Sequence, residues 1–96
     1  VFGDRAGTVV SVQEAHTTPS PISDSELTLW RNRGLILAPV LTTPLDLNTP
    51  SNTVQNGNVN LSFNDLIPDD SLGLEFTGLN ITGLKGAVVT VTIELD

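Results

Sequence analysis

The last eleven residues of the chain, GAVVTVTIELD, alternate between apolar and polar more regularly than any other stretch. A period of two places successive side chains on opposite faces, which is the pattern of a β-strand with one buried face. Chain ends usually fray, so a terminal strand this well defined needs a partner. One face would carry Ala87, Val89, Val91, Ile93 and Leu95.

A second alternating stretch, GTVVSVQEA at residues 7–15, lies near the other end of the chain. We expect Val10 and Val12 to share one face and Val9 the other. Neither stretch carries a charge between its flanking residues, namely Arg5 and Glu14 or Lys85 and Glu94. Exposed strand edges are normally protected by Lys, Pro or a bulge, so both stretches are predicted to be paired.

Short strands separated by turn residues fill the rest of the chain, and no helical period of useful length is present. Asn56-Gly57 predicts a type I′ hairpin, with Val59, Leu61 and Phe63 facing inward. Residues 72–96 are predicted to supply core strands, with inward side chains at Leu74, Phe76, Val89, Val91 and Ile93. The sequence therefore predicts an all-β protein, a small antiparallel β-sandwich of six to seven strands, immunoglobulin-like or of jelly-roll type.

Composition divides the chain into three parts. Residues 1–15 form an N-terminal strand, residues 16–25 a linker rich in Pro, Ser and Thr, and residues 26–96 the sandwich body. The N-terminal strand could pair within its own domain, or the linker could let it complete the sheet of a neighbouring copy. For the second arrangement, the expected subunit interface consists of Val9, Val10, Val12, Val89, Val91 and Ile93.

The net charge of −7 would repel a phosphate backbone, so nucleic acid is not an expected partner. No apolar run approaches the roughly 20 residues that span a bilayer, so membrane insertion is not expected either. The chain does not begin with Met, which predicts processing after export and an extracellular, cell-surface or virion location. Asn60-Leu61-Ser62 and Asn80-Ile81-Thr82 are glycosylation sequons.

No constellation of residues predicts a reaction, so we expect no enzyme, no catalytic residues, no cofactor, no resident metal and no small-molecule ligand. His16 is the only histidine and is expected to be a solvated loop residue. Asp65, Asp69 and Asp70 could gather around calcium, but Asn-Asp and Pro-Asp-Asp also form turns. Trp30 is predicted on the face opposite Leu27 and Leu29, either packed or exposed as a platform for a sugar.

These features favour a structural subunit of an extracellular filament, surface layer or virion-type assembly, built by β-strand pairing or donation between copies of the chain. The alternative is a secreted β-sandwich module that binds carbohydrate at Trp30 or calcium near Asp65, Asp69 and Asp70.

Overall fold

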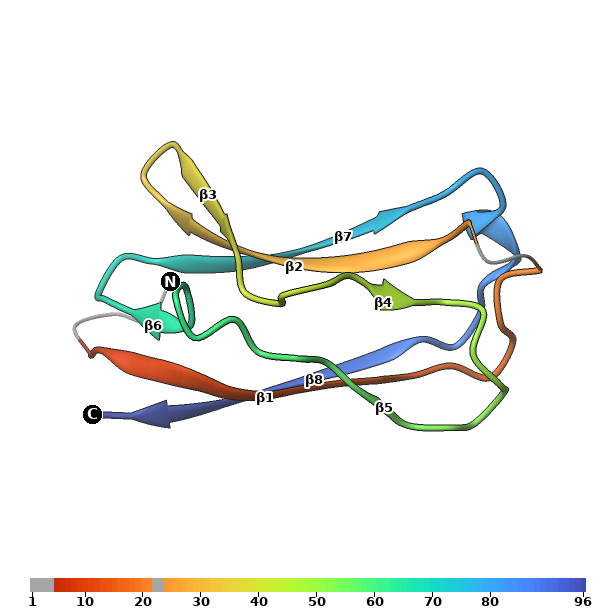
Figure 1. Cartoon of the computed structure of the whole chain (residues 1–96), viewed down its shortest axis with the longest axis horizontal. Helices are drawn as coiled ribbons and strands as arrows, with labels where there is room; N and C mark the ends of the chain where they lie inside the picture. Colours follow the sequence, from red (N-terminus) through yellow and green to blue (C-terminus); the bar gives the residue numbers. More distant parts are fainter. Residues whose placement is uncertain (1–4, 22–23) are drawn as a thin grey trace.

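The computed structural model describes residues 5–21 and 24–96, which form two facing β-sheets (Figure 1). The strands are β1 (Gly7–Ala15), β2 (Glu26–Arg33), β3 (Ile36–Pro39), β4 (Leu45–Asp46), β5 (Gln55–Asn56), β6 (Asp65–Leu66), β7 (Ser71–Thr77) and β8 (Val88–Leu95). A single 3-10 turn, η1 (Ile81–Gly83), lies between β7 and β8. The predicted all-β sandwich is confirmed, although three of its strands contain only two residues each.

Each sheet is built around a long strand from the first part of the chain that pairs with a long strand from the last part. In one sheet β1 pairs with β8 along its length, and with β5 and β6 on its other edge. In the other sheet β2 pairs with β7, and with β3 and β4 on its other edge. All these pairs are antiparallel. β1 and β2 are the central strands, because each of them is paired on both edges.

A β-bulge in β1 changes which side chains face the core. The pairing of β1 with β8 shifts register between Val9 and Ser11, which leaves Val10 as the extra residue. Val9 and Val12 are consequently both buried, while Val10 is 47% exposed. The expectation that Val10 and Val12 share a face is wrong, because the bulge reverses the alternation between them.

Two turns illustrate how tertiary pairing decides local structure. Gly34 has a φ of 64° at the first central position of the two-residue turn between β2 and β3, as a type II′ hairpin requires. The predicted hairpin at Asn56-Gly57 is wrong, because neither residue has a positive φ. Instead β5 runs beside β1, and Gly57 donates its N–H to the Val12 carbonyl at 2.8 Å.

The core lies between the central strands and the long connection that follows β3. Partly buried side chains from β7, β8 and η1 pack against it, including Val89, Val91 and Ile93. Leu61 and Phe63, predicted to face inward, are exposed instead. The buried apolar residues that form the core cluster are Val9, Val12, Leu27, Leu29, Val40, Leu41, Leu45, Leu47 and Leu66.

The segment predicted as a linker, residues 16–25, lies against the body where the structure describes it. Ser20 is buried and donates its backbone N–H to the Leu47 carbonyl, and Thr18 forms a β-bridge with Lys85. Residues 22 and 23 of this segment, and residues 1–4 of the predicted N-terminal strand, fall outside the described residues. The described part of residues 1–15 pairs within its own chain, through β1.

Candidate functional site

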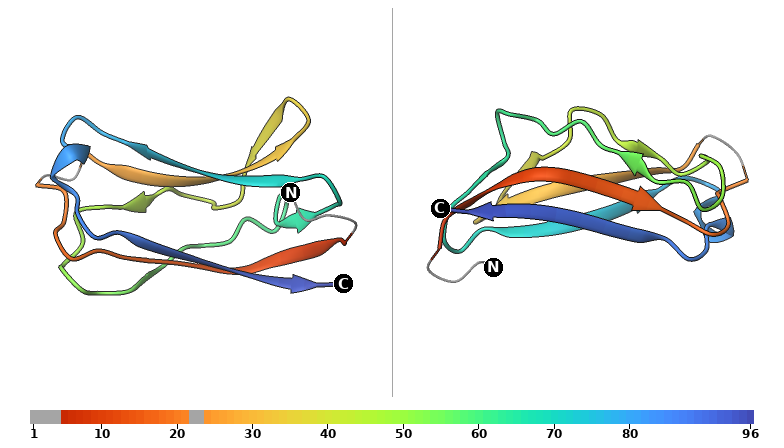
Figure 2. Two further views of the ribbon diagram at one scale, coloured as in Figure 1. Left: turned by 180° about the vertical axis from the view of Figure 1, so that it is seen from behind. Right: turned by 90° about the horizontal axis from the view of Figure 1, so that it is seen from below.

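One side of the sandwich, formed by β7 and β8, leaves apolar side chains uncovered. Figure 2 shows both strands along the same side of the body, with the segment from β3 to β6 on the opposite side. Leu74 and Phe76 face inward from β7, opposite buried Leu29 and Leu27, yet they are 46% and 41% exposed. The prediction that Leu74 and Phe76 are buried is therefore wrong, because no described segment covers this side.

The open side also presents two strand edges. Among residues 5–21 and 24–96, β8 pairs only with β1, and β7 pairs only with β2. Unpaired backbone N–H and C=O groups on such edges can pair with another strand. We therefore define the open side by β7, β8 and the inward side chains Leu72, Leu74, Phe76, Val89, Val91 and Ile93, and treat it as the candidate site.

The structure divides the predicted interface residues into three groups. Val9 and Val12 have almost no exposed surface in this arrangement, so neither is accessible to a second copy. Val10 points away from the core, on the outer face of the sheet that contains β1 and β8. Only the β8 residues, Val89, Val91 and Ile93, lie on the open side, half-buried against the core.

The acidic turn predicted around Asp65, Asp69 and Asp70 forms ion pairs with arginines. Arg33 donates to both Asp70 carboxylate oxygens, at 2.9 and 2.8 Å, and Arg31 donates to Asp65 Oδ1 at 2.8 Å. The hydrogen bond from Arg33 lowers the pKa of Asp70 despite its burial. Burial raises the pKa of Asp65, but its arginine partners outweigh this and leave the pKa below its ordinary value. These contacts occupy two of the three predicted carboxylates, those of Asp65 and Asp70.

His16 is buried, and the prediction of a solvated loop histidine is wrong. Its Nδ1 lies 2.8 Å from Glu14 Oε2, and its Nε2 donates to the Thr49 carbonyl at 2.7 Å. Burial lowers the pKa of His16, but these hydrogen bonds, together with the negative charges of Glu14 and Asp46, outweigh it and raise the pKa above its ordinary value. The pair fastens the end of β1 to the connection between β4 and β5, which is a structural role.

Trp30 lies on the outer face of its sheet, as predicted. It is half-buried, pairs with Gly73 across the strands and donates its indole N–H to Glu75 Oε1 at 3.2 Å. A Cβ added at Gly73 would have no neighbour within 4 Å, so the surface beside Trp30 is open.

The two sequons differ in their surroundings. Asn60 Oδ1 accepts a hydrogen bond from the Ser62 N–H at 3.0 Å, whereas Asn80 Nδ2 donates to Asp24 Oδ2 at 3.2 Å. Both asparagines are half-buried. Glycosylation of Asn60 and Asn80 stays a prediction.

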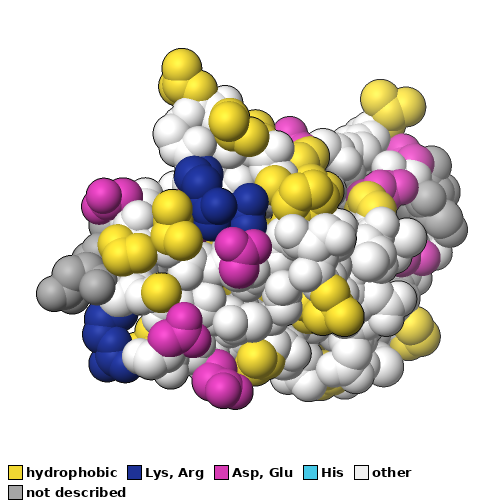
Figure 3. Space-filling view, turned by 60° about the vertical axis from the view of Figure 1, so that its left-hand side comes forward, with side chains coloured by type: hydrophobic (Ala, Val, Ile, Leu, Met, Phe, Trp, Pro, Cys, Tyr) yellow, Lys and Arg dark blue, Asp and Glu magenta, His cyan; other side chains and the backbone are white. Residues whose placement is uncertain are grey.

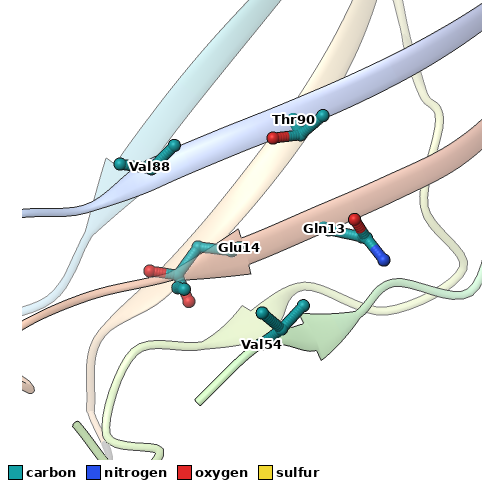
Figure 4. Close-up of a pocket in the computed structure, with 6 residues that line it drawn as sticks. Gln13, Glu14, Val54, Val88 and Thr90 are labelled. Carbon is teal, nitrogen blue, oxygen red and sulfur yellow. The ribbon is translucent and has the colours of Figure 1, made fainter. Parts of the chain in front are cut away.

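A shallow hollow lies on the outer face of the β1–β8 sheet (Figure 4). Its volume is about 160 Å³, and its lining includes Val54, Val88, Gln13 and Thr90. Sites for small molecules usually occupy roughly 300–1,000 Å³, so this hollow is too small to suggest a ligand.

The β2–β3 hairpin carries a second exposed apolar group. Leu35, Ile36 and Leu37 at its tip are all strongly exposed. Figure 3 shows hydrophobic side chains on a projection from the body, above Lys or Arg side chains that lie beside acidic ones. Apolar clusters on a surface are typical of contact sites, although small ones also occur on monomers.

Comparison with protein-family models, curated proteins and solved structures found no match to this chain. Within the described residues, no group of three or more His, Cys, Asp or Glu side chains is placed to hold a metal ion. The same residues contain no helix that is long and apolar enough to cross a membrane.

Proposed function

We propose that the protein is a structural subunit that assembles with copies of itself by β-strand pairing, in an extracellular filament, a surface layer or a virion-type assembly. The observation that carries this proposal is the open side, where two strand edges that no other described segment pairs with flank inward apolar side chains that are only partly covered. Leu74 and Phe76 are 46% and 41% exposed, so covering the remaining surface of either would contribute about 1 kcal/mol, less than half of the value for a fully exposed side chain.

The edge of β8 lacks the features that normally prevent pairing. Between Lys85 and Glu94 it contains no charge, no Pro and no bulge. Because β1 is paired on both edges within its own chain, we propose that the contact between copies lies at β8 and not at β1. This changes which strand meets the neighbour and keeps strand pairing as the mode of assembly.

Light scattering and negative-stain imaging over a wide concentration range test the proposal. Thr90 and Thr92 project from the outer face of β8, so Thr90→Lys with Thr92→Lys adds charge to the edge without altering the core. The matched control is Thr43→Lys, an exposed threonine on the opposite side of the body. We expect the wild type and the control to assemble and the double variant to remain monomeric. A wild-type chain that stays monomeric at every concentration would overturn the proposal.

A carbohydrate-binding module is the second candidate, because Trp30 lies on an outer sheet face beside the open surface at Gly73. Aromatic rings with one accessible face can pack against sugar rings. The chain contains a single tryptophan, so titration of its fluorescence with oligosaccharides reports on this site alone. A saturable fluorescence change in the wild type, together with calorimetric binding of the same sugar that Trp30→Phe abolishes, would favour this function over assembly.

A further inference from the structure

Successive residues of β8 direct their backbone N–H and C=O groups to opposite edges of the strand. This alternation determines which residues could form hydrogen bonds with an added strand. Asp96 donates its N–H to the Ala6 carbonyl, so even-numbered residues of this strand direct their backbone groups toward β1. Gly57 donates to the Val12 carbonyl on the far edge of β1, and Val12 is the partner of Val91. The N–H and C=O groups of Val89, Val91 and Ile93 consequently point toward the open edge.

Charge along β8 favours an antiparallel neighbour. The strand is preceded by the cation Lys85 and ends with the anions Glu94 and Asp96, with no charge between. An antiparallel second copy would bring Lys85 near the acidic end of its partner, whereas a parallel copy would align like charges. A two-fold axis pairs the same strand of both copies, and two-fold dimers are the commonest symmetric homo-oligomers.

The same approach covers the apolar side chains of β7. Because β7 and β8 lie on one side of the body, a two-fold axis through the β8 edge also brings the two β7 strands toward each other (Figure 2). The molecule measures 40 × 24 × 20 Å, and this side is bounded by the two longer dimensions. A side of these dimensions has room for a standard interface, to which each partner contributes roughly 800 Å².

We infer that two copies pair through antiparallel β8 strands, with Val91 of each copy on the two-fold axis, to form a closed dimer with one continuous sheet, which is the unit of the larger assembly. This inference rests on the proposed function and names its partner, a second copy, and its register. Val91 of one copy then faces Val91 of the other, and Val89 of each copy faces Ile93 of its partner, in hydrogen-bonded pairs. Thr90 of one copy faces Thr92 of the other in a non-hydrogen-bonded pair, where Cα atoms lie about 4.5 Å apart.

Cysteine cross-linking tests this register, because the chain contains no cysteine of its own. The Thr90→Cys and Thr92→Cys variants are purified separately, mixed under reducing conditions to exchange subunits, and then oxidised. The expected Cα separation lies within the range that disulfides accept, so we expect the mixture to form a linked dimer about tenfold faster than either variant alone. In each variant alone, the two cysteines are displaced along the strand by two residues.

The outcomes separate the register from the function. Preferential cross-linking in the mixture supports the inference. Equal or absent cross-linking in samples that light scattering shows to be oligomeric overturns the register and leaves the proposed function standing. Monomeric samples overturn both. The mixture of Thr90→Cys with Thr43→Cys is the matched control, and efficient linking there would also overturn the register by showing random collision.

Discussion

Glu14 and His16, two residues apart at the end of β1, form an ion pair with a 2.8 Å separation and no exposed side-chain surface. Both face inward because the bulge at Val10 sets the phase of the strand beyond it. Gln55 donates to the second Glu14 oxygen at 2.7 Å, and the Thr49 carbonyl accepts from His16. A buried pair of this kind is costly to break, because the remaining partner is left without its counter-charge.

Stability is expected to decrease as the pH rises above about 6.5, the ordinary pKa of histidine. The folded-state pKa of His16 is raised, so its protonation contributes stability in full below the unfolded pKa of about 6.5, and this is lost as the pH rises through the higher folded value. Urea unfolding measured from acidic to alkaline pH checks this. His16→Gln should lower the free energy of unfolding by about 3 kcal/mol below neutral pH and flatten the profile. An unchanged profile would contradict the assignment of a charged, paired histidine.

Replacing Val12 by Ala should cost about 2 kcal/mol, because the side chain is fully buried in the core. Val10→Ala is the matched control, with the same atoms removed from the exposed bulge position, and should change stability by less than about 0.5 kcal/mol. Denaturant unfolding of the two variants compares them directly. Equal losses would show that Val10 faces the core as well.

The sequence predicted the sandwich and the inward set on β8, because β8 is regular and its alternation is undisturbed. It did not predict the bulge at Val10. In GTVVSV, a regular strand could direct either Val9 or Val10 toward the core, and only the pairing with β8 decides between them. Burial of His16 was missed for a related reason. The residues that cover it come from positions 46–55, and that contact is invisible in the local sequence.

The candidate site was predicted only in part. Val89, Val91 and Ile93 were identified from their alternation, but whether β8 lies at the centre or the edge of a sheet depends on the topology of the whole chain. The alternation around Leu74 and Phe76 is the same as in a strand with one buried face. The sequence near these residues does not indicate whether another segment covers that face.

Asp70→Asn should reduce stability at neutral pH by about 1.5–3 kcal/mol, because it removes the charge that Arg33 binds and weakens the acceptor for the Ile67 N–H. The pKa of Asp70 is lowered, so the wild type keeps this contribution above the unfolded pKa and loses it as the pH falls through the folded value. The variant should therefore show a shallower loss in acid. Asp69→Asn is the control, because Asp69 has a φ of 75° and Asn tolerates that conformation.

Calcium is expected to leave the melting temperature unchanged, within about 1 °C, because Asp65 and Asp70 are held by arginines. Differential scanning calorimetry with calcium, and with EDTA, measures this. A rise of several degrees that Asp69→Asn removes would instead favour the calcium-binding alternative.

The tip of the β2–β3 hairpin should tolerate polar residues, provided that its turn is preserved. Leu35 and Ile36 are exposed, so Leu35→Ser with Ile36→Thr removes little buried surface and should change the free energy of unfolding by less than about 0.5 kcal/mol. Gly34→Ala should cost more, about 1–2 kcal/mol, because Gly34 has a positive φ that a Cβ disfavours. Light scattering of the tip variant completes the experiment. If pairing occurs at β8, assembly should match the wild type, and a loss of assembly would place the contact between copies at this hairpin.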